Sequence, residues 1–225
     1  MRHVMRRPGR TWPMRVKDGF YPRRSAWERR RRLLAARRKN GEERIALALE
    51  KPVVPCDNPS GIIVFDTETT GLDPDQDEIL QISIIDGYGE TLLNSYVSPY
   101  FKNNWPKAQR VNGISREMVR NAPYPHELIP VVRGLFETAK TLMAYNNPFD
   151  LSFLSKWGVF PEGKRQIDVM RQFARIYGEK DDKHGGFKWK KLLFASEYFG
   201  YTFKAHDSLE DAKATLYIYN KMQGC

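Results

Sequence analysis

The sequence predicts an α/β protein in which a mixed central sheet is flanked by helices. Residues 61–65 form an apolar, mostly β-branched run that is typical of a buried strand. Two more strand patterns follow it directly, and helical patterns fill most of the remaining chain. With 225 residues, of which 41% are hydrophobic, the chain can bury one sizeable core.

The expected strands are short apolar runs bounded by turn residues, and they lie at 61–68, 78–86, 90–97 and 141–145. The turn Gly87-Tyr88-Gly89 suits a hairpin between the second and third strands. The expected helices have apolar residues at helical spacing, and they lie at 105–111, 115–121, 125–139, 149–157, 168–178, 188–199 and 208–222. Proline at position 148 can begin the fourth helix, and Asp168 is expected to cap the fifth.

The segment between 187 and 199 mixes aromatic and basic residues. We expect its aromatic side chains to join the core, and these are Phe187, Trp189, Phe194 and Phe199. The lysines between them are either solvated or turned toward phosphates, and these are Lys188, Lys190 and Lys191.

Positive charge is concentrated at the amino-terminal end. Residues 1–51 contain 17 Lys and Arg but 5 Asp and Glu, whereas the whole chain has a net charge of +10. We expect a basic, partly helical arm at 1–51 with a capping box at Ser25, a linker at 52–60, and one domain at 61–225. Such an arm is typical of contact with nucleic acid or an acidic partner. There are three alternatives for the arm: it docks to a DNA polymerase or another replication partner, it is a solvated tail, or it is an organellar transit peptide.

No stretch reaches the roughly 20 apolar residues that a membrane helix needs, so we expect no membrane contact. The two cysteines, Cys56 and Cys225, offer no disulfide framework, and nothing resembles a secretory signal peptide. A reducing compartment, and hence a cytoplasmic protein, is therefore expected.

Two acids follow the first strand at alternate positions. Asp66 and Glu68 point to one side of a strand, and Thr67 points to the other. Two like charges beside a dry core raise each other's pKa unless a positive charge lies between them. A bound metal ion is the simplest candidate for that charge.

Further acids occupy the first turns of two expected helices. Asp150 lies beside an apolar stripe at the start of one helix. Asp207 or Ser208 can cap the last helix, which places Asp211 in its first turn and His206 on the preceding loop. Each acid taken alone is ordinarily a cap or a solvated charge. Their occurrence together with the two strand acids indicates a metal site.

Three motifs resemble the exonuclease motifs of the DEDDh family, which includes the proofreading exonuclease subunit of bacterial DNA polymerase III. They are Phe-Asp-Thr-Glu-Thr-Thr-Gly at 65–71, Asn-x-x-Phe-Asp-x-x-Phe-Leu at 146–154, and His-Asp-Ser-x-x-Asp-Ala-x-Ala-Thr at 206–215. The resemblance covers about residues 62 to 222. It implies an RNase H-like fold and an enzyme that removes nucleotides from 3′ ends.

The resemblance implies two divalent cations, Mg²⁺ or Mn²⁺, held by four carboxylates: Asp66, Glu68, Asp150 and Asp211. It implies that His206 is the general base that takes a proton from the attacking water. Hard cations prefer carboxylate oxygens, and a paired site suits phosphodiester hydrolysis. The resemblance also implies that five residues hold the 3′-terminal nucleotide: Thr67, Thr70, Leu72, Asn146 and Phe149.

The chain departs from the usual pattern of the family at three positions. Tyr145 and Asn147 stand where His and Ala are usual, and Asn112 stands where His is frequent. In relatives these positions help to hold the terminal nucleotide, so they bear on base preference and on the strength of binding.

We therefore expect a metal-dependent 3′-to-5′ exonuclease acting on single-stranded or frayed DNA in proofreading, replication or repair. Its products would be nucleoside 5′-monophosphates. One alternative is an exoribonuclease of the same superfamily. Another, from a different class, is a non-catalytic nucleic-acid-binding module that acts through the basic arm.

Overall fold

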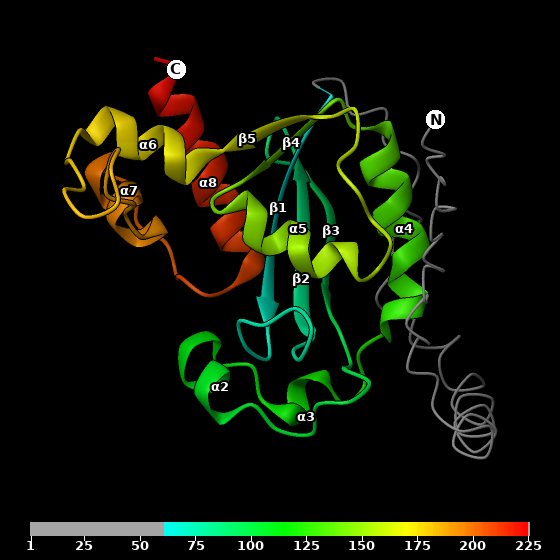
Figure 1. The fold of residues 1–225 in the computed structure, drawn as a ribbon. Coiled ribbons are helices and arrows are strands. Elements are labelled where there is room, and N and C mark those ends of the chain that lie inside the picture. Colours follow the sequence, from blue (N-terminus) through cyan, green and yellow to red (C-terminus); the bar gives the residue numbers. More distant parts are fainter. Residues whose placement is uncertain (1–60, 225) are drawn as a thin grey trace, which may run out of the picture. The chain divides into compact units, whose positions relative to one another are not determined.

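The structure is a computed structural model, and it describes residues 61–224. The strands are β1 (Ile62–Thr69), β2 (Ile79–Asp86), β3 (Thr91–Tyr96), β4 (Thr141–Ala144) and β5 (Arg165–Asp168). The helices are α2 (Pro106–Asn112), α3 (Arg116–Val119), α4 (Pro125–Thr138), α5 (Asn147–Ser155), α6 (Val169–Tyr177), α7 (Leu192–Tyr198) and α8 (Ser208–Met222). Figure 1 shows these elements in chain order.

The five strands form one mixed sheet, as predicted, in the order β3-β2-β1-β4-β5. The first three strands are antiparallel neighbours, and β1 is parallel to β4, which is parallel to β5. The predicted hairpin turn joins β2 to β3, where the N–H of Gly89 donates to the carbonyl of Asp86 at 3.1 Å. Gly89 has a φ of 93°, a conformation that favours glycine.

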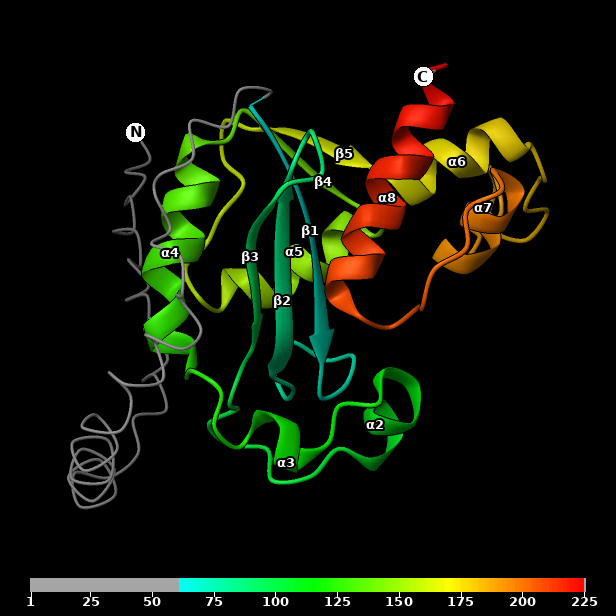
Figure 2. The ribbon, with the colours of Figure 1, turned by 180° about the vertical axis from the view of Figure 1, so that it is seen from behind.

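The two faces of the sheet carry different helices, as Figures 1 and 2 show from opposite sides. Ile63 and Phe65 of β1 belong to a buried cluster with residues of α4 and α5. Val64, between them, belongs to a second cluster with residues of α6, α7 and α8. This alternation follows from the two-residue period of a strand. Because β1 is covered on both faces, its sequence is apolar until the strand reaches its end.

A third, smaller cluster holds α2 and α3 beyond the end of β1 (Figure 1). Trp105, Ile114 and Val119 pack there with Leu80 of β2. The indole N–H of Trp105 donates to the carbonyl of Ile114 at 2.7 Å, which closes this segment on itself. These helices therefore sit next to the point where β1 presents its acids.

Most predicted elements agree with the structure to within two or three residues at their ends, but two do not. β5 was not predicted, because Ile167 is its only buried residue and four residues give little pattern. α7 begins at Leu192 and not at 188. The core prediction for 187–199 was wrong for Phe187, Trp189 and Phe194, which are 36%, 61% and 38% exposed. Phe199 does pack against the second cluster, as predicted.

The predicted arm at 1–51, its capping box at Ser25 and the linker at 52–60 lie outside the described residues. They remain predictions. Within residues 61–224, no helix combines the length and the apolar character that crossing a bilayer requires.

Candidate active site

The end of β1 carries Asp66 and Glu68 on the face of the sheet that α8 covers. In the antiparallel pair, Asp66 lies opposite Ser83 of β2, and Glu68 lies opposite Gln81. Residues directly opposite share a face. The hydroxyl of Ser83 lies 2.7 Å from that of Ser208, the first residue of α8. This contact places the start of α8 beside the two strand acids.

The first turn of α8 adds Asp211, and the residue before its cap adds His206. Asp207, one of the two predicted caps, accepts the N–H of Leu209 at 3.1 Å, and Ser208 is the first residue of the helix. The backbone N–H of His206 donates to both carboxylate oxygens of Asp211, at 3.2 and 3.3 Å. Among the described residues, His206 is the only non-glycine with a positive φ, 68°. Such a backbone conformation is uncommon and concentrates at functional sites.

Asp150 reaches the same place from the opposite face of the sheet. It lies in the first turn of α5 and is only 3% exposed. One of its carboxylate oxygens accepts the backbone N–H of Thr67 at 2.9 Å and the hydroxyl of Thr67 at 2.7 Å. Because Thr67 points away from Asp66 and Glu68, it can bind the carboxylate of Asp150, which comes from α5 on the opposite face of the sheet. Thr67 was predicted to contact a nucleotide. In this structure its hydroxyl donates a hydrogen bond to Asp150.

The four acids oppose each other's ionisation. Burial and then repulsion from the other three acids raise the pKa of Asp66 well above its usual range. Burial also raises the pKa of Glu68 to about 7, although the side-chain amide of Asn112 works against the shift. The pKa of Asp150 rises to about 7 through burial, and that of Asp211 to about 8 through burial and the charge of Glu68. Nearby cations would offset this repulsion and favour the ionised carboxylates.

The residues fit a divalent metal site. Glu68, Asp211 and His206 each offer a ligand atom, and these atoms lie within 4.8 Å of one another. Asp66 and Asp150 add carboxylates that are close enough for the mutual repulsion described above. A donor set dominated by carboxylate oxygens suits hard cations such as Mg²⁺ and Mn²⁺.

These pKa shifts predict how the stability of the metal-free protein depends on pH. Unfolded Asp and Glu lose their protons near pH 4. In the folded state Glu68, Asp150 and Asp211 keep their protons to about pH 7 or 8. Between about pH 4 and pH 8 the folded state therefore binds more protons than the unfolded state does. Stability must therefore fall as pH rises through that window.

Urea unfolding in EDTA at pH 5 and pH 8 measures this effect. We expect a lower free energy of unfolding at pH 8, and we expect Mn²⁺ or Mg²⁺ to restore stability there far more than at pH 5. Asp211→Asn should flatten the pH dependence. Stability that is equal at both pH values and indifferent to metal would contradict the prediction.

All ten predicted site residues line one cavity of about 630 Å³. Seven further residues line it that the sequence analysis did not assign to the site: Thr69, Gly71, Asp77, Lys107, Ala108, Val111 and Leu192. Lys107 and Val111 are four residues apart on α2, so they face the same side of that helix. The sequence feature that could have indicated these two residues is their position shortly before Asn112. Leu192 comes from α7 and had no local signal.

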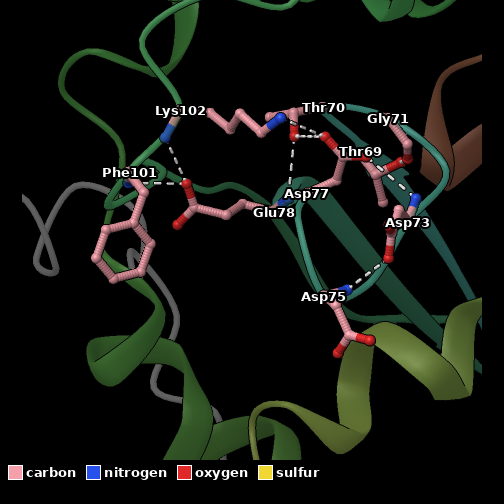
Figure 3. A network of polar contacts seen from close by, with 9 residues as sticks. All are labelled: Thr69, Thr70, Gly71, Asp73, Asp75, Asp77, Glu78, Phe101 and Lys102. Atoms are coloured by element: carbon pink, nitrogen blue, oxygen red, sulfur yellow. Dashed lines mark hydrogen bonds and ion pairs between the residues drawn. The ribbon is translucent and has the colours of Figure 1, made fainter. Parts of the chain in front are cut away.

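The loop after β1, which carries Thr70 and Leu72 into the cavity, is fixed by a polar network (Figure 3). The hydroxyl of Thr70 donates to Asp77 and accepts the N–H of Glu78, both at 3.0 Å. The ammonium of Lys102 lies 3.0 Å from Asp77. A Cβ on Gly71 would lie 2.3 Å from the carboxylate of Asp77, so a larger residue there would displace Asp77 from this network.

Glu78 anchors the same loop to the segment after β3. Its carboxylate accepts three consecutive backbone N–H groups, those of Tyr100, Phe101 and Lys102, at 2.7, 2.8 and 2.7 Å. Burial opposes ionisation of Asp77, but hydrogen bonds from the backbone of Asp73 and from Lys102 lower its pKa overall. The network thus holds a rigid loop from which Leu72 projects, 83% exposed, at the cavity.

The three departures from the family pattern all lie at or beside the cavity. The side chain of Asn112 donates to the carbonyl of Thr69 at 3.2 Å and accepts the N–H of Ile114 at 3.1 Å. Tyr145 lines the cavity and donates its hydroxyl to the carbonyl of Lys190 at 2.8 Å. Asn147 is buried, and its side-chain amide has no hydrogen-bond partner among the described residues.

Comparisons with known proteins identify the family of this chain. The family model described as RNase T, exonuclease, matches residues 63–219. The uncharacterized exonuclease CP81 of Escherichia phage 186 is 33% identical over 172 residues, which cover 71% of this chain and 87% of the phage protein. The DNA polymerase III subunit epsilon of Rickettsia conorii is 34% identical over 162 residues, which cover 58% of this chain and 69% of that protein.

Other relatives are much longer than this chain. The PolC-type DNA polymerase III of Caldanaerobacter subterraneus is 30% identical over 168 residues, which are 71% of this chain but 11% of the polymerase. Among solved structures, E. coli Exonuclease I in complex with a dA16 oligonucleotide shares the fold, with a TM-score of 0.60 and 19% identity. That match covers 72% of this chain and 40% of Exonuclease I.

Proposed function

The chain belongs to the RNase T family and is a 3′-to-5′ exonuclease of the DEDD type, and from this premise we propose that it removes nucleotides from single-stranded or frayed DNA. The products are nucleoside 5′-monophosphates. One observation carries the proposal: four carboxylates and one histidine from three separate parts of the chain converge at the end of β1.

Each of the five residues has a role in this proposal. Asp66, Glu68, Asp150 and Asp211 would hold two divalent cations, Mg²⁺ or Mn²⁺. When bound, the cations activate water and stabilise the charge that develops on the phosphate. His206 accepts the proton of the attacking water, because its backbone is held at Asp211 while its side chain stays exposed to the cavity. Thr67 keeps Asp150 in place through two hydrogen bonds.

The rest of the cavity is suited to a terminal nucleotide. Leu72 and Val111 are 83% and 58% exposed there, so they offer apolar surface to a base. Phe149 lines the same cavity. Lys107 is exposed and forms no ion pair within the described residues, so it is free to contact a phosphate. We propose that Thr70, Asn146 and Asn112 complete the contacts through their polar groups.

DNA is the favoured substrate because named relatives of this chain are parts of DNA polymerases. A role in proofreading, replication or repair follows from the same similarity. We also propose a cytoplasmic location and a contact between the basic arm and nucleic acid or a replication partner. The support for the arm's role is its excess of 17 Lys and Arg over 5 Asp and Glu.

Digestion of labelled oligonucleotides tests the proposal. With Mg²⁺ or Mn²⁺, a DNA strand labelled at its 5′ end should shorten one nucleotide at a time, and a mismatched primer end should be cut faster than a matched one. EDTA should stop the reaction. RNA of the same sequence should be cut more slowly; faster cutting of RNA would favour the exoribonuclease alternative. Products released from the 5′ end, or internal cuts, would refute the proposal.

A further inference from the structure

The surface of α6 and α7 exposes an unusual number of large apolar side chains. Of the twelve exposed large hydrophobic residues in the described part of the chain, six lie between 176 and 198: Ile176, Phe187, Trp189, Leu193, Phe194 and Tyr198. A single exposed aromatic residue needs no explanation, but a group of this size commonly marks a binding surface. Trp189 is the largest of them and is 61% exposed.

The segment that carries Trp189 is attached directly to the active-site cavity. The hydroxyl of Tyr145, which lines the cavity, donates to the carbonyl of Lys190 at 2.8 Å. Leu192 lines the cavity too. Three residues span at most about 10 Å, so Trp189 lies within that distance of Leu192. Stacked nucleotides rise about 3.4 Å each, so a strand leaving the cavity could reach Trp189 within a few nucleotides.

The same segment is held in one conformation. The backbone N–H of Lys188 donates to the carbonyl of Glu179 at 2.8 Å, and the ammonium groups of Lys188 and Lys190 both bind the Glu179 carboxylate. These two lysines therefore lie on one side. Consecutive side chains of an extended segment point to opposite sides, so Trp189, which stands between the two lysines, points away from them. It faces Arg171.

Basic residues outnumber acidic residues around Trp189. The guanidinium of Arg171 lies over the indole ring, 5.5 Å from its centre; its side chain is 54% exposed and pairs with Asp168 at 3.4 Å. Lys191 is exposed and forms no ion pair within residues 61–224. Residues 164–191 contain nine Lys and Arg and four Asp and Glu, whereas residues 61–100 contain eight acids and no Lys or Arg. An exposed aromatic ring among cations matches the stacking faces and the phosphates of a single strand.

We propose that Trp189, supported by Arg171, stacks against a base of the single strand a few nucleotides upstream of the 3′ end. This inference rests on the proposed function, because it places the 3′ end of the strand in the cavity. Trp189 does not line the cavity, so a dinucleotide held there would not contact it, whereas a hexanucleotide would extend to it. The tryptophan would therefore favour longer strands without touching the reacting phosphate.

Steady-state hydrolysis of DNA strands of two, six and twelve nucleotides by the full-length chain tests this. Trp189→Ala should raise KM for the two longer strands by about 5- to 100-fold and leave kcat/KM for the dinucleotide unchanged. Trp189→Phe, which keeps a ring, should retain most of the affinity. Phe160→Ala is the matched control, since Phe160 is 55% exposed and lies in the connection between α5 and β5. Wild-type KM values for Trp189→Ala at every length would overturn the proposal.

Binding measured without hydrolysis separates this inference from the proposed function. The affinity for a fluorescent dodecanucleotide is measured in EDTA at about 0.3 M salt, which weakens the contribution of the basic arm. If wild-type protein cuts no strand at all, the proposed function fails. Weaker binding by Trp189→Ala than by Phe160→Ala would still support the stacking site. Equal binding by the two variants would exclude it.

Discussion

Replacing Asp66 by alanine or asparagine is expected to lower kcat by several orders of magnitude while the protein remains folded. Asp66 belongs to the acidic cluster, since Asp150, Asp211 and Glu68 all raise its pKa in addition to burial. Without its charge the metal site is incomplete. The fold should not suffer, because the substitution also removes repulsion from the metal-free protein. Asp211→Ala should behave in the same way.

The measurement is single-turnover hydrolysis of a DNA strand with saturating Mg²⁺, together with the urea midpoint in EDTA. Asp75→Ala serves as the control, because the side chain of Asp75 is 71% exposed and pairs with Lys156 away from the cluster. Its rate should equal that of the wild type. A rate within tenfold of wild type for Asp66→Asn would remove the basis of the proposed mechanism.

His206→Asn is expected to lower kcat by about 10²- to 10⁴-fold, the usual contribution of a general base. Asparagine is the sharper substitution, because it tolerates the positive φ of 68° at this position better than alanine does. The backbone N–H that donates to Asp211 is then retained, and only the imidazole is lost. A fall in rate would thus report on the ring itself and not on the loop.

The pH profile separates a base from a structural residue. The pH dependence of the wild-type rate should differ from that of His206→Asn, because only the wild type has the imidazole. DNA affinity in EDTA should be unchanged. His184→Asn is the matched control, because the side chain of His184 is 81% exposed and contacts Asp181 outside the cavity. If His206→Asn kept both the wild-type rate and the wild-type profile, another group would have to be the base.

Several features of the site were predictable because they depend on local periodicity. The alternation of a strand placed Asp66 and Glu68 on one face, and helix starts placed Asp150 and Asp211 in first turns. The cap at Asp168 was also predicted, and it accepts the N–H of Arg171 at 2.9 Å. In each case the signal lies within a few residues of the side chain concerned.

Contacts between distant parts of the chain were not predictable in this way. Thr67 holds Asp150 across 83 positions, and Tyr145 holds Lys190 across 45, with no pattern that links the partners. β5 has too little apolar sequence to be recognised alone, and it forms because β4 offers a free edge. The lysines near 188 bind Glu179 and keep that segment out of helix α7.

The amino-acid sequence by itself determined which groups perform the chemistry and on which elements they stand, because strand and helix periods are local. Only the tertiary structure decided what supports those groups and what surrounds them. Burial and mutual repulsion raise the pKa values of the acids, and the exposure of Trp189 depends on how α6 and α7 pack. Both properties arise from neighbours that are far away in the chain, so no local pattern contains them.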